Sequence, residues 1–166
     1  MEKKYELTDE ILEVGGRVLH RINALRNFGN IKQGEIGGWI ENEDNLSHCG
    51  DCWVYGDAEV YGNAKVYGNA KVLGDAEVYG NAEVYGNAEV LGDAEVEKKS
   101  DYIVFKNWWS SGRYFTWTRS NDKWRVGCFY GTGEELIKKA YNDSEEKGRE
   151  YERVVKYVES IKSEIK

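Results

Sequence analysis

The chain has 166 residues, of which 32% are charged and 40% are hydrophobic, and its net charge at pH 7 is -7. This balance excludes a disordered chain and predicts one domain or two small ones. Proteins that bind nucleic acid usually carry a basic face that neutralises phosphates, so the acidic balance argues against direct binding to nucleic acid.

The sequence predicts a cytoplasmic protein without membrane contact. It contains no run of about 18 apolar residues, the length a membrane span needs. Its first residues, MEKKYELTDE, lack the apolar stretch of a signal peptide. Cys49, Cys52 and Cys128 are odd in number and lack the spacing of a disulfide framework, which fits a reducing compartment.

Residues 1–35 are predicted to form a β-hairpin that caps the fold. The stretch EILEVGGRVLHRI has two strand-like runs on either side of Gly15 and Gly16. Adjacent glycines between such runs favour a two-residue hairpin turn.

A six-residue repeat dominates residues 36–96. Val recurs at every sixth position from 54 to 96, and Ala lies two residues before each Val from Val60 onwards. Residues two apart in a strand share a face, so each hexad predicts a short strand with both side chains inward. The Gly-Asn or Gly-Asp pair before each strand favours a sharp bend.

A longer period predicts how the short strands stack. The string GDAEV recurs at 56–60, 74–78 and 92–96, so three hexads close one coil. This spacing is typical of a triangular parallel β-solenoid with ladders of Val and Ala inside. The small-residue position continues backwards through Cys52, Leu46 and Ile40, and the aliphatic position reappears at Ile36. We therefore expect the solenoid to begin near Ile36.

The outer surface of the predicted solenoid carries two kinds of ladder. An acidic ladder has carboxylates at inter-coil spacing, which repel one another and favour water, a cation or a basic partner. Stacked tyrosines suit protein contacts, so we expect a homo-oligomer, either a trimer or a dimer. The acidic ladder comprises Asp57, Asp75, Asp93, Glu59, Glu77 and Glu95, and the tyrosine pairs are Tyr61 with Tyr79 and Tyr67 with Tyr85.

We predict no catalytic residue, no metal site and no cofactor. In the CGDC string the register places Cys52 inward and Cys49 outward, so the two cannot share an ion, and Cys52 is predicted to be a small core residue. His48 falls six residues before Val54 and is predicted to be a capping histidine bonded to backbone. The alternative, in which His48 is the base of an acyltransferase, lacks the inserted loop that such enzymes often carry.

Residues 97–166 are predicted to form a small antiparallel sheet followed by two helices. Three β-type runs are separated by SSG and SND. Thr132 and Glu135 have the spacing of a capping box at the start of the first helix. In the second helix one face is apolar, and it comprises Tyr151, Val154, Val155, Val158, Ile161 and Ile165.

The predicted ligand-binding site lies in the strings WWSSGRYFTWTRS and GCFYGTGEE. Cationic and hydroxyl donors beside aromatic rings suit a nucleotide or another phosphorylated ring compound. A glycine-rich helix start offers free backbone N–H groups to an anion. The alternative is that the aromatic residues form the core of the sheet and the arginines its solvated rim. The candidate residues are Trp109, Ser110, Ser111, Gly112, Arg113, Trp117, Arg119, Gly131, Thr132 and Gly133.

The repeat Tyr-Gly-Asn-Ala-Lys-Val, flanked by LRNFGNIKQGEIGGWIENEDNLS and WSSGRYFTWTRSNDKWRVGCFYGTGEELIKKAY, resembles phage and prophage proteins of the hexapeptide-repeat class. The resemblance covers nearly the whole chain. It implies a mainly β fold with a left-handed parallel β-helix of three hexapeptides per coil, and a phage setting. It transfers no catalytic residue.

The sequence thus predicts a non-enzymatic binding protein. The main hypothesis is a phage anti-defence factor, in the host-cell cytoplasm, that sequesters a small, nucleotide-derived anionic signal. The alternatives are an inhibitor that binds a host defence protein through the acidic ladder, in the manner of a DNA mimic, and a hexapeptide acyltransferase.

Overall fold

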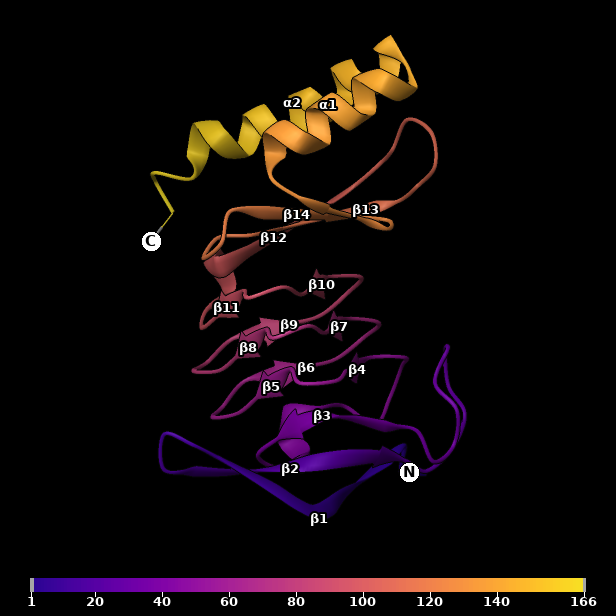
Figure 1. Cartoon of the computed structure of the whole chain (residues 1–166), viewed down its shortest axis with the longest axis vertical. Helices are drawn as coiled ribbons and strands as arrows, with labels where there is room; N and C mark the ends of the chain where they lie inside the picture. Colours follow the sequence, from indigo (N-terminus) through magenta and orange to yellow (C-terminus); the bar gives the residue numbers. More distant parts are fainter. Residues whose placement is uncertain (1, 166) are drawn as a thin grey trace.

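The computed structural model describes residues 2–165 and shows three parts stacked along one axis (Figure 1). An N-terminal hairpin lies at one end, a β-solenoid in the middle, and a small sheet covered by two helices at the other end. The order is the one that the sequence predicts.

The N-terminal hairpin extends a sheet of the solenoid. Strands β1 (Tyr5–Val14) and β2 (Arg17–Ala24) pair antiparallel, and the turn between them is Gly15-Gly16 with φ of 53° and 83°. Positive φ at both positions is the geometry that glycine permits in a tight hairpin turn. Strand β2 then pairs antiparallel with β3 (Ile36–Ile40), so the hairpin and the solenoid share one sheet.

The hexads form the predicted solenoid with three faces. The first face continues the hairpin sheet in the order β1-β2-β3-β5-β8-β11, the second has the order β10-β7-β4, and the third pairs β6 with β9. Every stacked pair within the repeat is parallel. The two-residue strands are β4 (Trp53–Val54), β5 (Glu59–Val60), β6 (Lys65–Val66), β7 (Lys71–Val72), β8 (Glu77–Val78), β9 (Glu83–Val84), β10 (Glu89–Val90) and β11 (Glu95–Val96).

The predicted inward and outward positions of the repeat are confirmed. The Val and Ala ladders from Val54 to Val96 are at most 1% exposed, and they form one continuous core. The tyrosines lie outside, where Tyr61 stacks on Tyr79 and Tyr67 on Tyr85 with ring centroids 5.4 and 5.0 Å apart. Cys52 is buried and Cys49 is exposed, also as predicted.

The register of the first coil differs from the prediction. Ile40 pairs with Val60 and Leu46 with Val66, whereas Val54 pairs with Val72. Ile40 and Leu46 therefore occupy the aliphatic position rather than the small one. The expectation that Ile36 points inward is wrong, because its side chain is 54% exposed.

The register shift has its origin in a hexad that is two residues longer than the others. The Ser47 amide donates to Val66 O, as Tyr67 N donates to Val84 O, and Gly50 already lies against Gly68. His48 and Cys49 are therefore the extra residues. Counting back in sixes from Val54 passes through this insertion. The sequence therefore assigned Ile36, Ile40 and Leu46 to the wrong positions of the repeat.

The C-terminal sheet closes the open end of the solenoid. Its strands β12 (Tyr102–Lys106), β13 (Tyr114–Thr118), β14 (Lys123–Val126) and β15 (Phe129–Gly131) are antiparallel neighbours, one strand more than the three predicted. The hydroxyls of Thr116 and Ser120 accept from the backbone N–H groups of Glu89 and Glu95 at 3.1 and 2.8 Å. These bonds satisfy donors that have no further coil to pair with.

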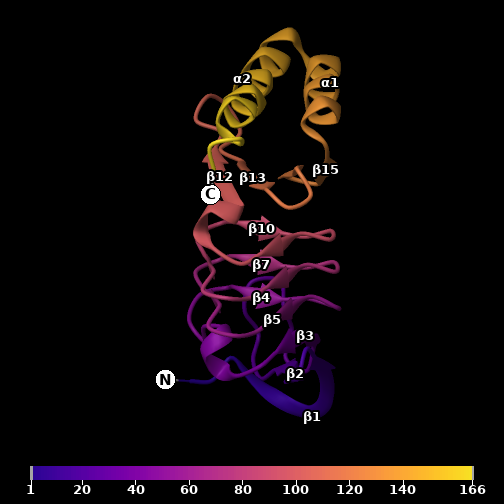
Figure 2. The ribbon, with the colours of Figure 1, turned by 90° about the vertical axis from the view of Figure 1, so that its left-hand side faces the viewer.

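Two helices cover the face of this sheet that points away from the solenoid (Figure 2). Helix α1 (Gly133–Asp143) begins with the predicted capping box of Thr132 and Glu135, and α2 (Glu145–Ile161) follows at once. Their apolar residues form a second core with the sheet, and that core includes Phe115, Trp117, Trp124, Leu136, Tyr151, Val155 and Val158. Between residues 2 and 165 neither helix is long and apolar enough to cross a membrane.

Candidate functional site

The predicted site residues from Trp109 to Gly112 lie in the turn between β12 and β13. The Asn107 carboxamide organises this turn, because its Oδ1 accepts from the backbone N–H groups of Trp109 and Ser110 at 3.1 and 2.9 Å. Its Nδ2 donates to the hydroxyls of Ser110 and Ser111, each at 3.1 Å. The serines therefore fix the turn through Asn107, and the Trp109 ring packs on Tyr151.

Trp117 and Arg119 serve the structure of the sheet. The Trp117 ring is 1% exposed and its Nε1 donates to Asp122 at 2.8 Å, so a ligand cannot stack on it. Arg119 contacts Asp101 at 3.4 Å and donates to the Ile165 carbonyl at 2.9 Å, which ties the end of β13 to the C-terminal segment.

The helix start at Gly131, Thr132 and Gly133 is filled by the chain's own groups. The Glu135 carboxylate accepts from Thr132 N at 3.0 Å, and Thr132 Oγ1 accepts from Glu135 N at 3.1 Å. These bonds to Thr132 lower the pKa of Glu135. A Cβ on Gly133 would lie 2.6 Å from the Val155 side chain, so this glycine permits close packing of α1 on α2. The carboxylate of Glu135 thus takes the place that an anionic ligand would have at this helix start.

Arg113 lines a cavity together with a second cation, Lys71, whereas Arg119 lines a different cavity beside the carboxylates of Glu95, Glu97 and Asp101. A lobe of about 210 Å³ lies between the second face of the solenoid and the C-terminal sheet. Lys71 in β7 and Arg113, the residue before β13, give this lobe two cations, so we call it the cationic lobe. The cationic lobe is lined by Asn69, Lys71, Asn87, Glu89, Arg113, Tyr114 and Gly127.

An aromatic lobe of about 360 Å³ adjoins the cationic one and shares Asn87 and Tyr114 with it. We call the two lobes together the junction cleft. The volume of the aromatic lobe is in the range of small-molecule sites, and aromatic walls with a few polar groups are typical of such sites. The aromatic lobe is lined by Tyr85, Gly86, Asn87, Lys99, Tyr102, Val104 and Tyr114.

The electrostatics of the junction cleft favour an anion. Among residues 2–165 no carboxylate forms an ion pair with Lys71 or Arg113. Glu89 also lines the cationic lobe, but its carboxylate is paired with Arg125, 3.8 Å from Nε. Burial raises the pKa of Tyr102 to about 12, and its hydroxyl donates to the Glu83 carbonyl at 2.8 Å. Tyr102 is therefore a neutral part of the aromatic wall. In the cationic lobe Lys71 and Arg113 have no ion-pair partner among residues 2–165, although the charge of Arg113 helps to lower the pKa of Asp143.

The sequence missed most of this cleft because its residues come from two predicted parts. Only Arg113 was among the candidates. Lys71, Tyr85 and Asn87 belong to hexads that look alike in sequence, and nothing in the repeat says which coil meets the C-terminal sheet. The one available signal is that Lys71 occupies the position that Glu89 takes in the next coil.

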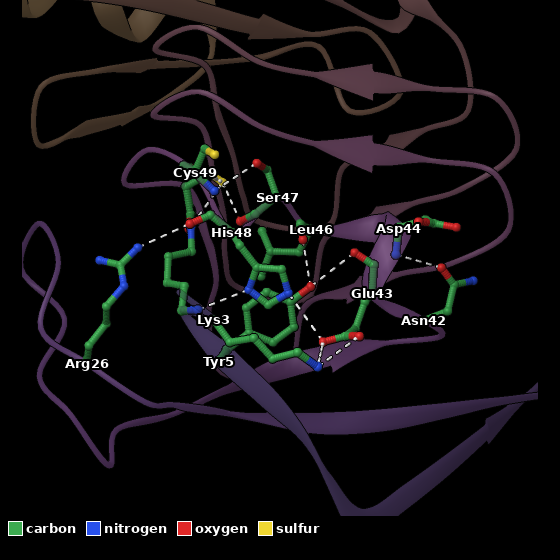
Figure 3. Close-up of polar contacts among 12 residues, drawn as sticks. Lys3, Tyr5, Arg26, Asn42, Glu43, Asp44, Leu46, Ser47, His48 and Cys49 are labelled. Atoms are coloured by element: carbon green, nitrogen blue, oxygen red, sulfur yellow. Dashed lines mark hydrogen bonds and ion pairs between the residues drawn. The ribbon is translucent and has the colours of Figure 1, made fainter. Parts of the chain in front are cut away.

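The capping histidine lies in a polar network at the other end of the solenoid (Figure 3). His48 Nδ1 accepts from Lys4 N at 3.0 Å, as predicted for a histidine bonded to backbone, and Nε2 lies 3.2 Å from the Glu43 carboxylate. Its ring stacks on Tyr5 with centroids 4.2 Å apart. Both ring nitrogens are thus engaged by groups of the cap.

The acidic ladder lies on the first face of the solenoid. Glu59, Glu77 and Glu95 are in register on neighbouring strands, and Asp57, Asp75 and Asp93 are exposed beside them. Burial and then the neighbouring Glu95 raise the pKa of Glu77, and burial and then Glu77 raise that of Glu59. These carboxylates therefore bind protons more tightly in the folded chain than in the unfolded one.

The raised pKa of Glu77 predicts that acid stabilises this face. Its stabilising contribution is complete below the unfolded pKa and is lost as the pH rises through the raised folded pKa. We expect Glu77→Gln to raise the free energy of unfolding at pH 7 and the gain to shrink towards pH 4, measured by urea unfolding across pH. Glu83→Gln, on the third face, is the matched control. An equal pH profile for the two variants would contradict the prediction.

The comparisons with known proteins give no family for this chain. No protein-family model matches the sequence, and no curated protein is significantly similar to it.

Proposed function

We propose that the protein is a non-enzymatic binding protein that sequesters a small, nucleotide-like anion in the junction cleft. The observation that carries the proposal is the cationic lobe, where Lys71 and Arg113 line one cavity beside Tyr114. Two cations without ion-pair partners among the described residues favour a phosphate or another compact anion.

The two lobes match the two ends of such a ligand. A planar ring fits the aromatic lobe against Tyr85, Tyr102 or Tyr114, while its anionic group lies in the cationic lobe. The Asn87 carboxamide lines both lobes and can bond to the part of the ligand between them. The lining offers binding groups without a nucleophile beside a general base, which favours sequestration over turnover.

The biological setting of the proposal follows from the resemblance of the repeat. A phage protein of this kind would act in the host-cell cytoplasm and lower the free concentration of a nucleotide-derived defence signal. The left-handed sense of the solenoid and assembly into a trimer or dimer belong to the same proposal. The paired tyrosines, with Tyr85 46% exposed, support contacts between copies.

A second candidate function rests on the acidic ladder. Asp57, Asp75 and Asp93 are exposed along one edge of the first face, at the spacing of successive coils. A regular row of carboxylates suits a basic surface on a partner protein, as in a DNA mimic. In this alternative the protein inhibits a host defence protein directly, and the junction cleft is not needed.

Native mass spectrometry of the protein purified from infected cells tests the two candidates together. We expect a retained small mass, released when the protein is denatured, and we expect its amount to fall sharply in an Arg113→Ala variant. A bound protein in place of the small mass would support the inhibitor. A chain that carries neither, purified from cells in which it protects the phage, would overturn sequestration.

A further inference from the structure

Lys4 is a buried amine at the N-terminal end of the solenoid. Its side chain is 0% exposed, and Nζ donates to the carbonyls of Cys52 and Gly50 at 2.7 and 3.3 Å. The ring of Phe28 lies 4.7 Å from Nζ. Among residues 2–165 no carboxylate lies within ion-pair distance of this amine, so its charge is not compensated by an acid.

The backbone holds Lys4 firmly in this position. Its N–H donates to His48 Nδ1 at 3.0 Å and its carbonyl accepts from Leu25 N at 2.8 Å. Burial lowers the pKa of the amine, which raises the fraction with a free lone pair on nitrogen. An amine held in place with a lowered pKa acts as a nucleophile once it has lost its proton.

Cys52 presents its sulfur to this amine. The thiol is 0% exposed in the first coil, and Lys4 Nζ donates to Sγ at 3.3 Å. Burial raises the pKa of this thiol, and the charge of Lys4 and its hydrogen bond lower it in part. Reacting atoms that are held about 3–3.5 Å apart are in a near-attack arrangement. Cys49 and Cys128 are exposed, so Cys52 is the buried thiol of the chain.

We propose that Lys4 and Cys52 form a reversible covalent bridge when the protein meets hydrogen peroxide. The peroxide O–O bond breaks, one oxygen binds Sγ to give a sulfenic acid, and the other leaves as water. The Lys4 lone pair then attacks Sγ, the S–O bond breaks, and the departing hydroxide takes a proton from nitrogen and leaves as a second water. The sulfur has lost two electrons to the peroxide, and the chain has lost two hydrogen atoms.

The bridge would act as a redox-sensitive staple on the N-terminal hairpin. It joins residues separated by 48 positions, and a cross-link that closes such a loop restricts the unfolded chain. The linked protein should therefore melt at a higher temperature. Two thiols of a reductant reverse the reaction, because they supply the two electrons and become a disulfide while the amine and thiol are restored.

Peptide mass spectrometry tests the bridge. The full chain carrying Cys49→Ser and Cys128→Ser is treated with hydrogen peroxide, alkylated and digested. The two serines remove any Cys49–Cys52 disulfide, which would also cost two hydrogens. We expect a product that joins the peptide containing Lys4 to the one containing Cys52, lighter by two hydrogen atoms and lost on reduction.

Two controls separate proximity from simple reactivity. The same chain oxidised in urea should give at least about tenfold less linked product, because the fixed 3.3 Å approach is lost. Lys4→Arg, which has no free amine, should give Cys52 sulfinic acid instead of the link. The proposal fails if folded protein yields sulfinic acid or unreacted thiol at a dose that fully oxidises Cys52 in urea, or if both conditions give equal linkage.

Discussion

Arg113→Ala is expected to weaken ligand binding by about ten- to a hundredfold while leaving the free energy of unfolding nearly unchanged. A charge-assisted hydrogen bond contributes about 1.5–3 kcal/mol, and about 1.4 kcal/mol corresponds to a factor of ten. The Arg113 side chain is exposed and forms no ion pair within residues 2–165, so folding does not depend on it. Titration calorimetry with a panel of cyclic nucleotides and ADP-ribose derivatives, followed by urea unfolding of each variant, measures both quantities.

Lys71→Ala and Arg119→Ala make this experiment specific. Lys71 lines the same lobe and should reproduce the loss of affinity, although it lies in the solenoid. Arg119 bonds to Asp101 and to the Ile165 carbonyl, so its loss should lower stability and leave affinity intact. If Arg119→Ala weakened binding as strongly as Arg113→Ala, the ligand would lie outside the junction cleft.

Arg113 and Arg119 were predicted as partners on one anion, and the geometry of a strand explains why they are separated. They flank β13, and six residues of extended chain span about 20 Å. Sequence proximity in a strand therefore places side chains far apart, whereas Lys71 and Arg113, distant in sequence, line one cavity.

The repeat could be predicted from sequence because every hexad repeats the same local physics. In each hexad the buried Val and Ala and the glycine at the bend can be assigned from the residues of that hexad alone. The insertion of His48 and Cys49 interrupts that regularity, and no local signal marks where two residues have been added. The positions of Ile36 and Ile40 could be read only from the pairing of whole strands.

The burial of Trp53 could not be predicted from the repeat either. It precedes an inward Val, so its side chain takes the outward position that Lys71 and Glu89 occupy on the next strands. The structure nevertheless buries it completely, because the segment after β2 folds over this face and places Phe28 against the indole, with ring centroids 5.2 Å apart. Gly37 makes room for the ring, since a Cβ there would lie 2.6 Å from Trp53 Cζ2.

Trp53→Ala is therefore expected to lower the free energy of unfolding by about 3–5 kcal/mol, the usual cost of removing a buried tryptophan. Trp53→Phe should cost much less, because among residues 2–165 the indole Nε1 is buried without a hydrogen-bond partner and Phe removes that group. Trp108→Ala, at a side chain that is 80% exposed, is the matched control and should change stability by no more than about 0.5 kcal/mol. Urea unfolding followed by far-UV circular dichroism gives all three values. Equal stability of Trp53→Ala and Trp108→Ala would show that the packing of the segment after β2 on Trp53 does not stabilise the fold.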